Sequence, residues 1–160
     1  MCSSDLKADE LNRRKAKFLA ITPHPGEMAR LLNSSTKSVQ EDRVTTAQEA
    51  ARRWNAHVIL KGSHTIIAGP DGQIFVNTSG NPGLAKGGSG DVLTGILAAL
   101  TAQFKTNDWT RVLALGVYLH GKAAEFATKH TDESGLLATE VASAVPHARH
   151  QLLQELQARE

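Results

Sequence analysis

Short apolar runs and helix-spaced apolar positions alternate along the chain. Residues 18–21 and 57–60 form short runs that are typical of buried strands. Two further apolar segments, 65–68 and 73–76, flank the turn Gly69-Pro70-Asp71-Gly72 and predict a β-hairpin. Because helical patterns precede and follow these segments, the order indicates an α/β fold.

Helical patterns occupy most of the remaining chain. They lie at residues 27–32, 38–54, 91–104, 108–128 and 139–156. Ser38 is expected to cap the second of these helices, and the strongly apolar third is expected to be buried. The packed side of the second is expected to carry Val44, Ala47, Ala51 and Trp54. In the fourth, Gly116 and Gly121 would allow a neighbouring segment to approach closely, and in the last Pro146 is expected to break or kink the helix.

The composition is that of an ordinary folded protein. Of 160 residues, 41% are hydrophobic and 21% are charged, which fits one globular domain. The net charge of +2 gives no support to nucleic acid or an anionic membrane as the main partner. The single cysteine, Cys2, the polar first residues and the lack of a long apolar stretch predict a cytoplasmic protein without a membrane span.

A glycine-rich loop at residues 80–91 is the most informative motif. Its last part, Gly87, Gly88, Ser89 and Gly90, leads directly into a predicted helix. Glycines let the backbone approach a ligand closely, and the free amides and positive dipole at a helix start converge on one point. The loop is therefore predicted to form an anion hole for a phosphate.

Two common phosphate motifs do not fit this loop. A P-loop needs Lys and then Ser or Thr after its last glycine, whereas Lys86 lies inside the loop. A dinucleotide fingerprint needs a small residue where Leu93 stands. Asp91, which follows the glycines, can act as a general base for a hydroxyl nucleophile or can simply cap the helix, and both interpretations stay open at this point.

A short polar segment follows the predicted strand at residues 57–60. It consists of Lys61, Gly62, Ser63, His64 and Thr65. Ligands of open α/β sheets lie beyond the carboxyl ends of strands, so this segment could hold the phosphate or ribose of a nucleotide. The alternative is a solvated turn that enters the hairpin.

The segment at residues 22–27 places a histidine between two prolines. The prolines restrict the backbone around His24, which could hold its imidazole against a ligand. The alternatives are a rigid turn with an exposed His24 and, for Glu27, a simple interaction with a helix dipole. His120, among apolar neighbours on a predicted helix, is expected to be a core histidine with its polar atoms satisfied.

Three motifs, in this order, resemble those of the ADP-dependent NAD(P)H-hydrate dehydratases of the ribokinase-like superfamily. They are residues 22–31, 60–65 and 80–95. The resemblance extends from residue 18 to the C-terminus and implies a ribokinase-like, three-layer α/β/α domain. It also implies repair of the hydrated cofactors NADHX and NADPHX to NADH and NADPH, by phosphorylation of the hydrate hydroxyl and elimination of phosphate.

The resemblance also assigns roles to the candidate residues. Asp91 matches the base that accepts the hydroxyl proton and contacts the hydrate, and residues 87–90 match the anion hole. Residues 61–65 and Gly90 match nucleotide-contacting positions, and His24 matches a position that contacts the hydrate. ADP is the implied co-substrate, with Mg²⁺ held largely by water and phosphates. An NAD(P)H-hydrate epimerase is the implied functional partner, and homo-oligomer formation is left open.

The resemblance leaves residues 1–17 unexplained. They are expected to form an atypical or disordered N-terminal segment, and residues 18–160 the C-terminal part of a dehydratase domain truncated at its N-terminus. The family has a substantial segment before the motif at residues 22–27, so this chain alone is expected to be poorly active or inactive. Two other functions fit the motifs: a ribokinase-like kinase for a pyrimidine or thiazole alcohol, and an inactive nucleotide-binding fragment.

Overall fold

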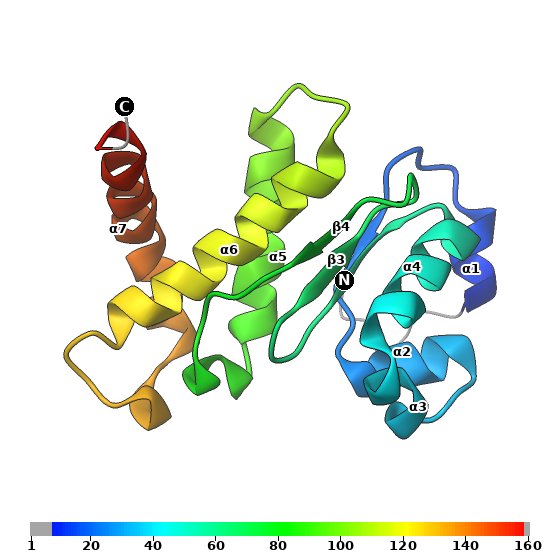
Figure 1. Cartoon of the computed structure of the whole chain (residues 1–160), viewed down its shortest axis with the longest axis horizontal. Helices are drawn as coiled ribbons and strands as arrows, with labels where there is room; N and C mark the ends of the chain where they lie inside the picture. The colour runs from blue at the N-terminus through cyan, green and yellow to red at the C-terminus, as the bar shows by residue number, and fades with distance from the viewer. Residues whose placement is uncertain (1–7, 159–160) are drawn as a thin grey trace. The chain divides into compact units, whose positions relative to one another are not determined.

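The computed structural model describes residues 8–158, with side chains described from residue 11 onward. The chain divides into two compact units: the first holds residues up to 77 together with 108–111, and the second holds 78–107 and the chain from 112. Figure 1 shows their elements in chain order. Cys2 and the rest of residues 1–7 lie outside the described residues, and helix α1 (Ala8–Arg13) occupies part of the expected N-terminal segment.

The first unit is built on a four-stranded sheet with short helices. The strands are β1 (Ala20–Ile21), β2 (His57–Leu60), β3 (Ile66–Ala68) and β4 (Ile74–Val76), and the helices are α2 (Pro25–Leu32), α3 (Thr36–Glu41) and α4 (Arg43–Trp54). The strands follow the order β1-β2-β3-β4. The first pair is parallel, and the other two pairs are antiparallel. The predicted strand at 57–60 and the predicted hairpin are therefore confirmed.

One apolar cluster forms the core of this unit. Helix α4 packs against β2 and β3. The strand residues Val58 and Leu60 join the cluster together with Met28 from α2 and Trp54 from α4, and all four are almost completely buried. Burial of each such large side chain stabilises the fold by about 1.5–3 kcal/mol. The cluster thereby fixes the ends of β1 and β2, from which two of the three motifs emerge.

The single helix predicted from Ser38 to Trp54 is wrong, because the segment forms two helices. Ser35, not Ser38, caps α3 by accepting a hydrogen bond from the Ser38 amide. Asp42 then leaves the helical conformation and caps α4, with its carboxylate accepting from the Thr45 amide at 3.0 Å. Because α4 begins only at Arg43, its packed side differs from the predicted one. Val44, which the sequence pattern placed on the packed side, is 41% exposed.

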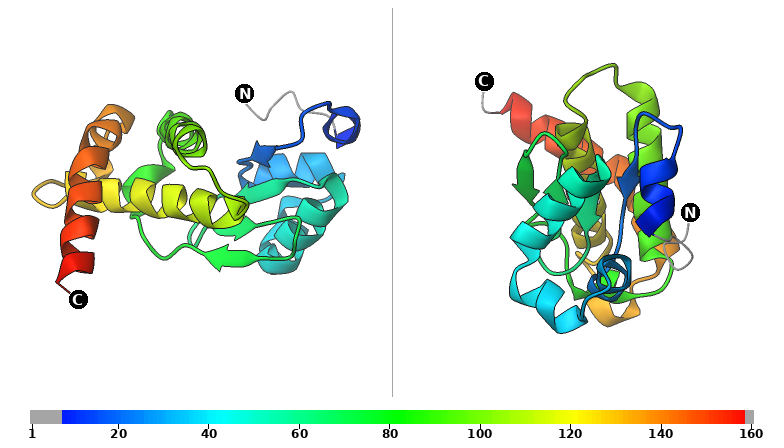
Figure 2. Two further views of the ribbon diagram at one scale, coloured as in Figure 1. Left: turned by 90° about the horizontal axis from the view of Figure 1, so that it is seen from above. Right: turned by 90° about the vertical axis from the view of Figure 1, so that its right-hand side faces the viewer.

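The second unit is mainly helical. It contains α5 (Ser89–Gln103), most of α6 (Trp109–Ala127), α7 (Ala138–Gln157) and the 3-10 turns η2 (Pro82–Ala85) and η3 (Glu133–Gly135). Figure 2 shows α7 beside the C-terminal end of α6. The predicted break of the last helix is absent, and α7 continues through Pro146. Buried residues on both sides of the proline, Val141 and Ala148, pack in one cluster with α6 and hold the helix together.

Helix α5 is less buried than its apolar content predicts. Only Ser89, Leu93 and Leu97 are buried among its residues, which form one stripe at four-residue spacing. The exposed positions carry small residues, for example Ala98 and Ala99, and these add little apolar surface. Hydropathy alone therefore overstated the burial of α5.

The predicted close approaches at the two glycines of α6 are confirmed. A Cβ atom added at Gly116 would lie 2.6 Å from Leu97 Cδ2 of α5, and one added at Gly121 would lie 2.6 Å from the carbonyl carbon of Ser79. The backbone of the glycine-rich loop thus lies directly against α6.

None of the helices in the described part of the chain has the length and apolar character of a membrane span.

Candidate functional site

Two of the sequence motifs lie together in the first unit. The turn at 22–27 follows β1, and the segment 61–65 follows β2. Because β1 and β2 are parallel, their carboxyl ends meet at one edge of the sheet. The Lys61 amide donates a 2.9 Å hydrogen bond to the Pro23 carbonyl, which joins the two segments directly.

His24 forms the N-cap of α2. Its Nδ1 atom accepts hydrogen bonds from the amides of Gly26 and Glu27 at 3.1 and 3.2 Å, while Glu27 Oε2 accepts from the His24 amide at 2.7 Å. This reciprocal pattern is a capping box with histidine in place of the usual serine or threonine. The hydrogen bonds fix the orientation of the imidazole, but the side chain is still 49% exposed. His24 can therefore form part of a rigid turn and also contact a ligand.

Glu27 does more than interact with the dipole of helix α2. Its side chain is only 10% exposed, and its Oε2 lies 3.9 Å from Lys61 Nζ, while Oε1 lies 3.5 Å from His24 Nε2. A buried carboxylate needs such partners to offset its lost hydration. Glu27 therefore joins the 22–27 turn to the 61–65 segment through side chains as well as backbone. In the sequence, the three-residue spacing of His24 and Glu27 matches a capping box and could have predicted their interaction.

The backbone of the segment 61–65 is held by a side chain of helix α4, Arg43. The Arg43 guanidinium donates hydrogen bonds to the carbonyls of Leu60, Lys61 and Ser63. Gly62 has a φ of +145°, and a Cβ there would lie 2.9 Å from Arg43 Nη2. The exposed residues 62–64 are thus presented outward on a backbone that is fixed by Arg43.

Replacing Arg43 is expected to loosen this segment. Arg43→Ala removes donors from three carbonyls, so we expect the free energy of unfolding to fall by about 1–3 kcal/mol. The lysine variant should recover only part of this, because an ammonium cannot reproduce the guanidinium fork. Denaturant titration measures the change, and Arg52→Ala, at an exposed position of the same helix, is the control. Equal stability of the alanine variants would show that Arg43 does not hold the segment.

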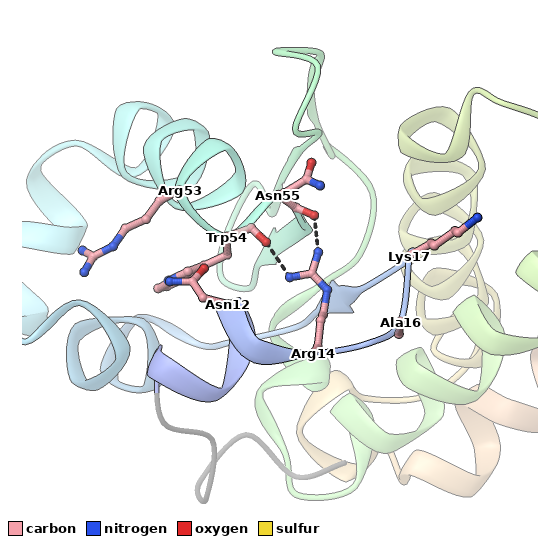
Figure 3. A pocket seen from close by; sticks show the side chains of 7 residues that line it. All are labelled: Asn12, Arg14, Ala16, Lys17, Arg53, Trp54 and Asn55. Carbon is pink, nitrogen blue, oxygen red and sulfur yellow. Dashed lines mark hydrogen bonds between the residues drawn. The ribbon is translucent and has the colours of Figure 1, made fainter.

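A hollow in the first unit does not coincide with these motifs (Figure 3). It is lined by Asn12, Arg14, Ala16, Lys17, Arg53, Trp54 and Asn55. The Arg14 guanidinium donates to the carbonyls of Trp54 at 2.6 Å and Asn55 at 2.5 Å, and so satisfies the C-terminal end of α4. These contacts give Arg14 a structural role at the end of the helix.

The third motif, the glycine-rich loop, lies in the second unit. Gly88 has a φ of +86° and forms the N-cap of α5 without a side-chain hydrogen bond. Within the described chain, the amides of Gly87, Gly88 and Gly90 have no protein acceptor, and Gly87 and Gly88 are exposed. Unpaired amides at the start of a long helix attract an anion.

Asp91 does not cap α5. The N-cap is Gly88, and Asp91 is the third residue of the helix, with its own amide donating to the Gly88 carbonyl at 3.1 Å. The carboxylate is exposed in the same helical turn as the free amides. Of the two interpretations of this residue, the structure gives the capping role no support.

Ser89 differs from its glycine neighbours because it points inward. It is 6% exposed, and its Oγ lies 3.3 Å from Nε2 of His120, which is 7% exposed. His120 is therefore a core histidine with a polar partner, as expected. Burial lowers the pKa of His120 to about 4, although a hydrogen bond with the Ser89 backbone acts in the opposite direction.

This shift predicts a pH dependence of stability. His120 binds a proton in the unfolded chain below its ordinary pKa of 6.5 but in the folded chain only below about 4. The stabilisation is therefore complete above pH 6.5 and is lost as the pH falls toward 4, by up to about 3 kcal/mol. Denaturant titrations at several pH values measure it. His120→Gln should remove this part of the pH dependence, and an unchanged slope in that variant would assign it to other groups.

A comparison with known protein families identifies the relationship. A family model described as NAD(P)H-hydrate dehydratase matches residues 5–147. The chain belongs to the NAD(P)H-hydrate dehydratase family.

Two relatives show that this chain covers only part of their length. The bifunctional NAD(P)H-hydrate repair enzyme Nnr of Moorella thermoacetica is 45% identical over 139 residues, which are 87% of this chain and 26% of that protein. An ADP/ATP-dependent NAD(P)H-hydrate dehydratase of Bacillus subtilis, co-crystallised with ATP and Mg²⁺, has a TM-score of 0.80 and 35% identity over 91% of this chain and 53% of its own. The chain thus spans about a quarter of the first and half of the second.

The fold class is confirmed by the solved structures. A ribokinase-like superfamily protein of Enterococcus faecalis has a TM-score of 0.69 and 33% identity, over 82% of this chain and 44% of its own. The α/β, ribokinase-like class expected for this NAD(P)H-hydrate dehydratase family member is therefore correct. The roles of His24, residues 61–65, residues 87–90 and Asp91 stay predictions.

Proposed function

We propose that this chain carries catalytic residues of an ADP-dependent dehydratase that converts NADHX and NADPHX to NADH and NADPH. The observation that carries the proposal is the start of α5. There the amides of Gly87, Gly88 and Gly90 have no acceptor among residues 8–158, and Asp91 is exposed in the same turn without a capping role. Membership of the dehydratase family supports the assignment.

The first chemical step is transfer of a phosphoryl group. The hydroxyl oxygen of the hydrate attacks the terminal phosphorus of ADP, the bond to the bridging oxygen breaks, and AMP leaves. Asp91 accepts the hydroxyl proton. The glycine amides face the phosphoryl oxygens and stabilise their charge, since phosphoryl transfer depends mainly on positioning and electrostatics.

The second step is elimination. The carbon–oxygen bond to the new phosphate ester breaks, and phosphate leaves with the bonding electrons. The neighbouring ring carbon loses a proton to water, and the double bond of the dihydronicotinamide forms. The products are NADH, AMP and phosphate. The hydroxyl oxygen of the hydrate leaves in the phosphate, and the two hydrogens of the eliminated water leave as protons.

The first unit supplies the proposed binding contacts. Residues 61–65, of which 62–64 are exposed, lie beyond the end of β2 and would contact the nucleotide. In the second unit, Gly90 is also proposed as a nucleotide-contacting residue. His24, fixed by its capping bonds, would contact the hydrate through the exposed part of its ring. Glu27 and Arg43 support these two segments from within the protein.

Magnesium fits this arrangement as an ion carried by the nucleotide. Among the described residues, no group of three or more His, Cys, Asp or Glu side chains could hold a metal. Nucleotide phosphates and water would supply most of the ligands, and the ion would add charge neutralisation during phosphoryl transfer.

The proposed reaction also bears on the partner enzyme and on the location of the protein in the cell. The Moorella relative is named as a bifunctional repair enzyme, and we place an NAD(P)H-hydrate epimerase alongside this chain as the functional partner. A cytoplasmic location fits the nicotinamide substrates and the single cysteine. We further propose that residues 18–160 form one portion of the catalytic domain, since the chain spans about half of the solved relative.

The test supplies hydrated NADH, ADP and Mg²⁺ and follows the absorbance of NADH. It uses the chain alone and the chain joined to the part of the Bacillus subtilis relative that it does not match. We expect ADP-dependent formation of NADH by the joined protein and weak or no formation by the chain alone. Absence of NADH with both proteins, while the intact relative is active, would contradict the proposed function.

A further inference from the structure

Helix α6 anchors the first end of the glycine-rich loop. Ser79 Oγ donates a 3.0 Å hydrogen bond to the Tyr118 carbonyl, and the Gly80 amide donates a 2.8 Å bond to Glu125 Oε1. Gly121 permits this contact, because a Cβ there would lie 2.8 Å from the Gly80 nitrogen. The position at which the loop begins is therefore set by α6.

The same helix also reaches the other end of the loop through His120. The Ser89 hydroxyl and the His120 Nε2 atom lie 3.3 Å apart, and both residues are more than nine-tenths buried. Ser89 is the only residue of the 87–90 segment that has a side chain beyond hydrogen. It is thus the one side-chain anchor by which the anion-hole segment can be attached to the protein interior.

We propose that His120 is a positioning residue that acts through Ser89 to hold the 87–90 segment with its free amides toward the nucleotide phosphate. The proposal rests on the proposed function, because it names the residue that orders the same anion hole. His120 lies on α6 and does not belong to the three motifs, so its part in the site is visible only through the contact with Ser89.

The physical reason is the freedom of the neighbouring glycines. Gly87, Gly88 and Gly90 have no side chains to restrict them, and Gly88 already adopts a positive φ. When Ser89 is anchored between them, the free amides of the glycines are held in one direction before a phosphate binds. Less conformational entropy is then lost on binding. The low pKa of His120 keeps the ring neutral at neutral pH, so it acts through geometry and not through charge on the phosphate.

A double-mutant cycle tests this coupling. The variants are Ser89→Ala, His120→Ala and the double variant of the whole chain, and the probe is ADP with Mg²⁺. Affinity is measured by calorimetry and by the amide NMR signals of Gly87, Gly88 and Gly90. We expect each single variant to bind ADP about tenfold more weakly, as befits one lost anchoring bond. The double variant should be no weaker than the weaker single variant, because both act through one contact.

Two controls separate positioning from general destabilisation. Ser143→Ala and His150→Ala change exposed residues of α7 and should leave the affinity and the glycine signals unchanged. His120→Gln retains a hydrogen-bonding group and should recover affinity to within about threefold of the original. Should His120→Ala fail to fold, the loss of ADP affinity in Ser89→Ala and its retention in His120→Gln still test the proposal.

The outcomes distinguish a failure of the nucleotide site from a failure of the role of His120. Glycine signals that do not respond to ADP in the unmodified chain would contradict the proposed nucleotide site itself. A normal response in the unmodified chain together with unchanged affinity in Ser89→Ala would overturn the role of His120 alone. Additive losses in the double variant would also overturn it, because His120 would then act by a route that bypasses Ser89.

Discussion

Asp91→Asn is expected to lower the rate of NADH formation by about a hundredfold to ten-thousandfold, the usual contribution of a general base. The amide has nearly the shape of the carboxylate but does not accept the hydroxyl proton, so the phosphoryl step slows. ADP binding should be preserved, because the proposed nucleotide contacts are the glycine amides and residues 61–65, and not the Asp91 carboxylate. The rate is measured with the joined protein, and ADP affinity by calorimetry.

A matched control makes this result specific. Glu49→Gln removes an exposed carboxylate on α4 and should leave both the rate and ADP affinity unchanged. If Asp91→Asn retained the full rate of NADH formation, Asp91 would not be the base. If it lost ADP affinity and rate together, the carboxylate would act in binding and not in proton transfer.

Gly88→Ala is expected to cause the largest loss of ADP binding among changes to the loop. Gly88 has a φ of +86°, and a Cβ there would lie 3.2 Å from the Cβ of Ala138. The strain is expected to cost about 1–3 kcal/mol, through reduced stability or a shifted backbone. A shifted backbone turns the free amides away from the phosphate, so ADP affinity should fall at least about tenfold.

Gly95→Ala is the control for this substitution. It lies on the same helix, has no positive φ and faces open space. Alanine should leave ADP affinity unchanged and raise stability by up to about 1 kcal/mol, because alanine favours the helix. Equal ADP affinity in Gly88→Ala and the unmodified chain would show that the conformation of Gly88 is not needed for binding.

Local patterns in the sequence predicted the parts of the fold that depend on neighbouring residues. The strand at 57–60, the hairpin around Gly69-Pro70-Asp71-Gly72 and the helix after the glycine-rich loop were all found. Each has a signal within a few residues, namely a short apolar run, turn chemistry or a helical pattern. The break at Asp42 escaped prediction because an aspartate inside an amphipathic pattern resembles an exposed helix residue until its cap is seen.

The supporting residues of the site depend on contacts between distant parts of the chain. Arg43 donates to the 61–65 segment, and His120 contacts Ser89, which lies 31 residues earlier. No local pattern indicates such pairs. Glu27 stands between the two cases: its capping spacing to His24 is local, but its ion pair with Lys61 is not. The motifs therefore indicated the candidate site, and the structure identified what holds its segments in place.

Analysis of the products is the most direct test of the central claim that the bound nucleotide drives dehydration. The joined protein is mixed with NADHX, ADP and Mg²⁺, and phosphorus NMR is recorded together with NADH absorbance. We predict that AMP, phosphate and NADH form in equal amounts. A stable phosphorylated compound without NADH would contradict the account and indicate a kinase instead.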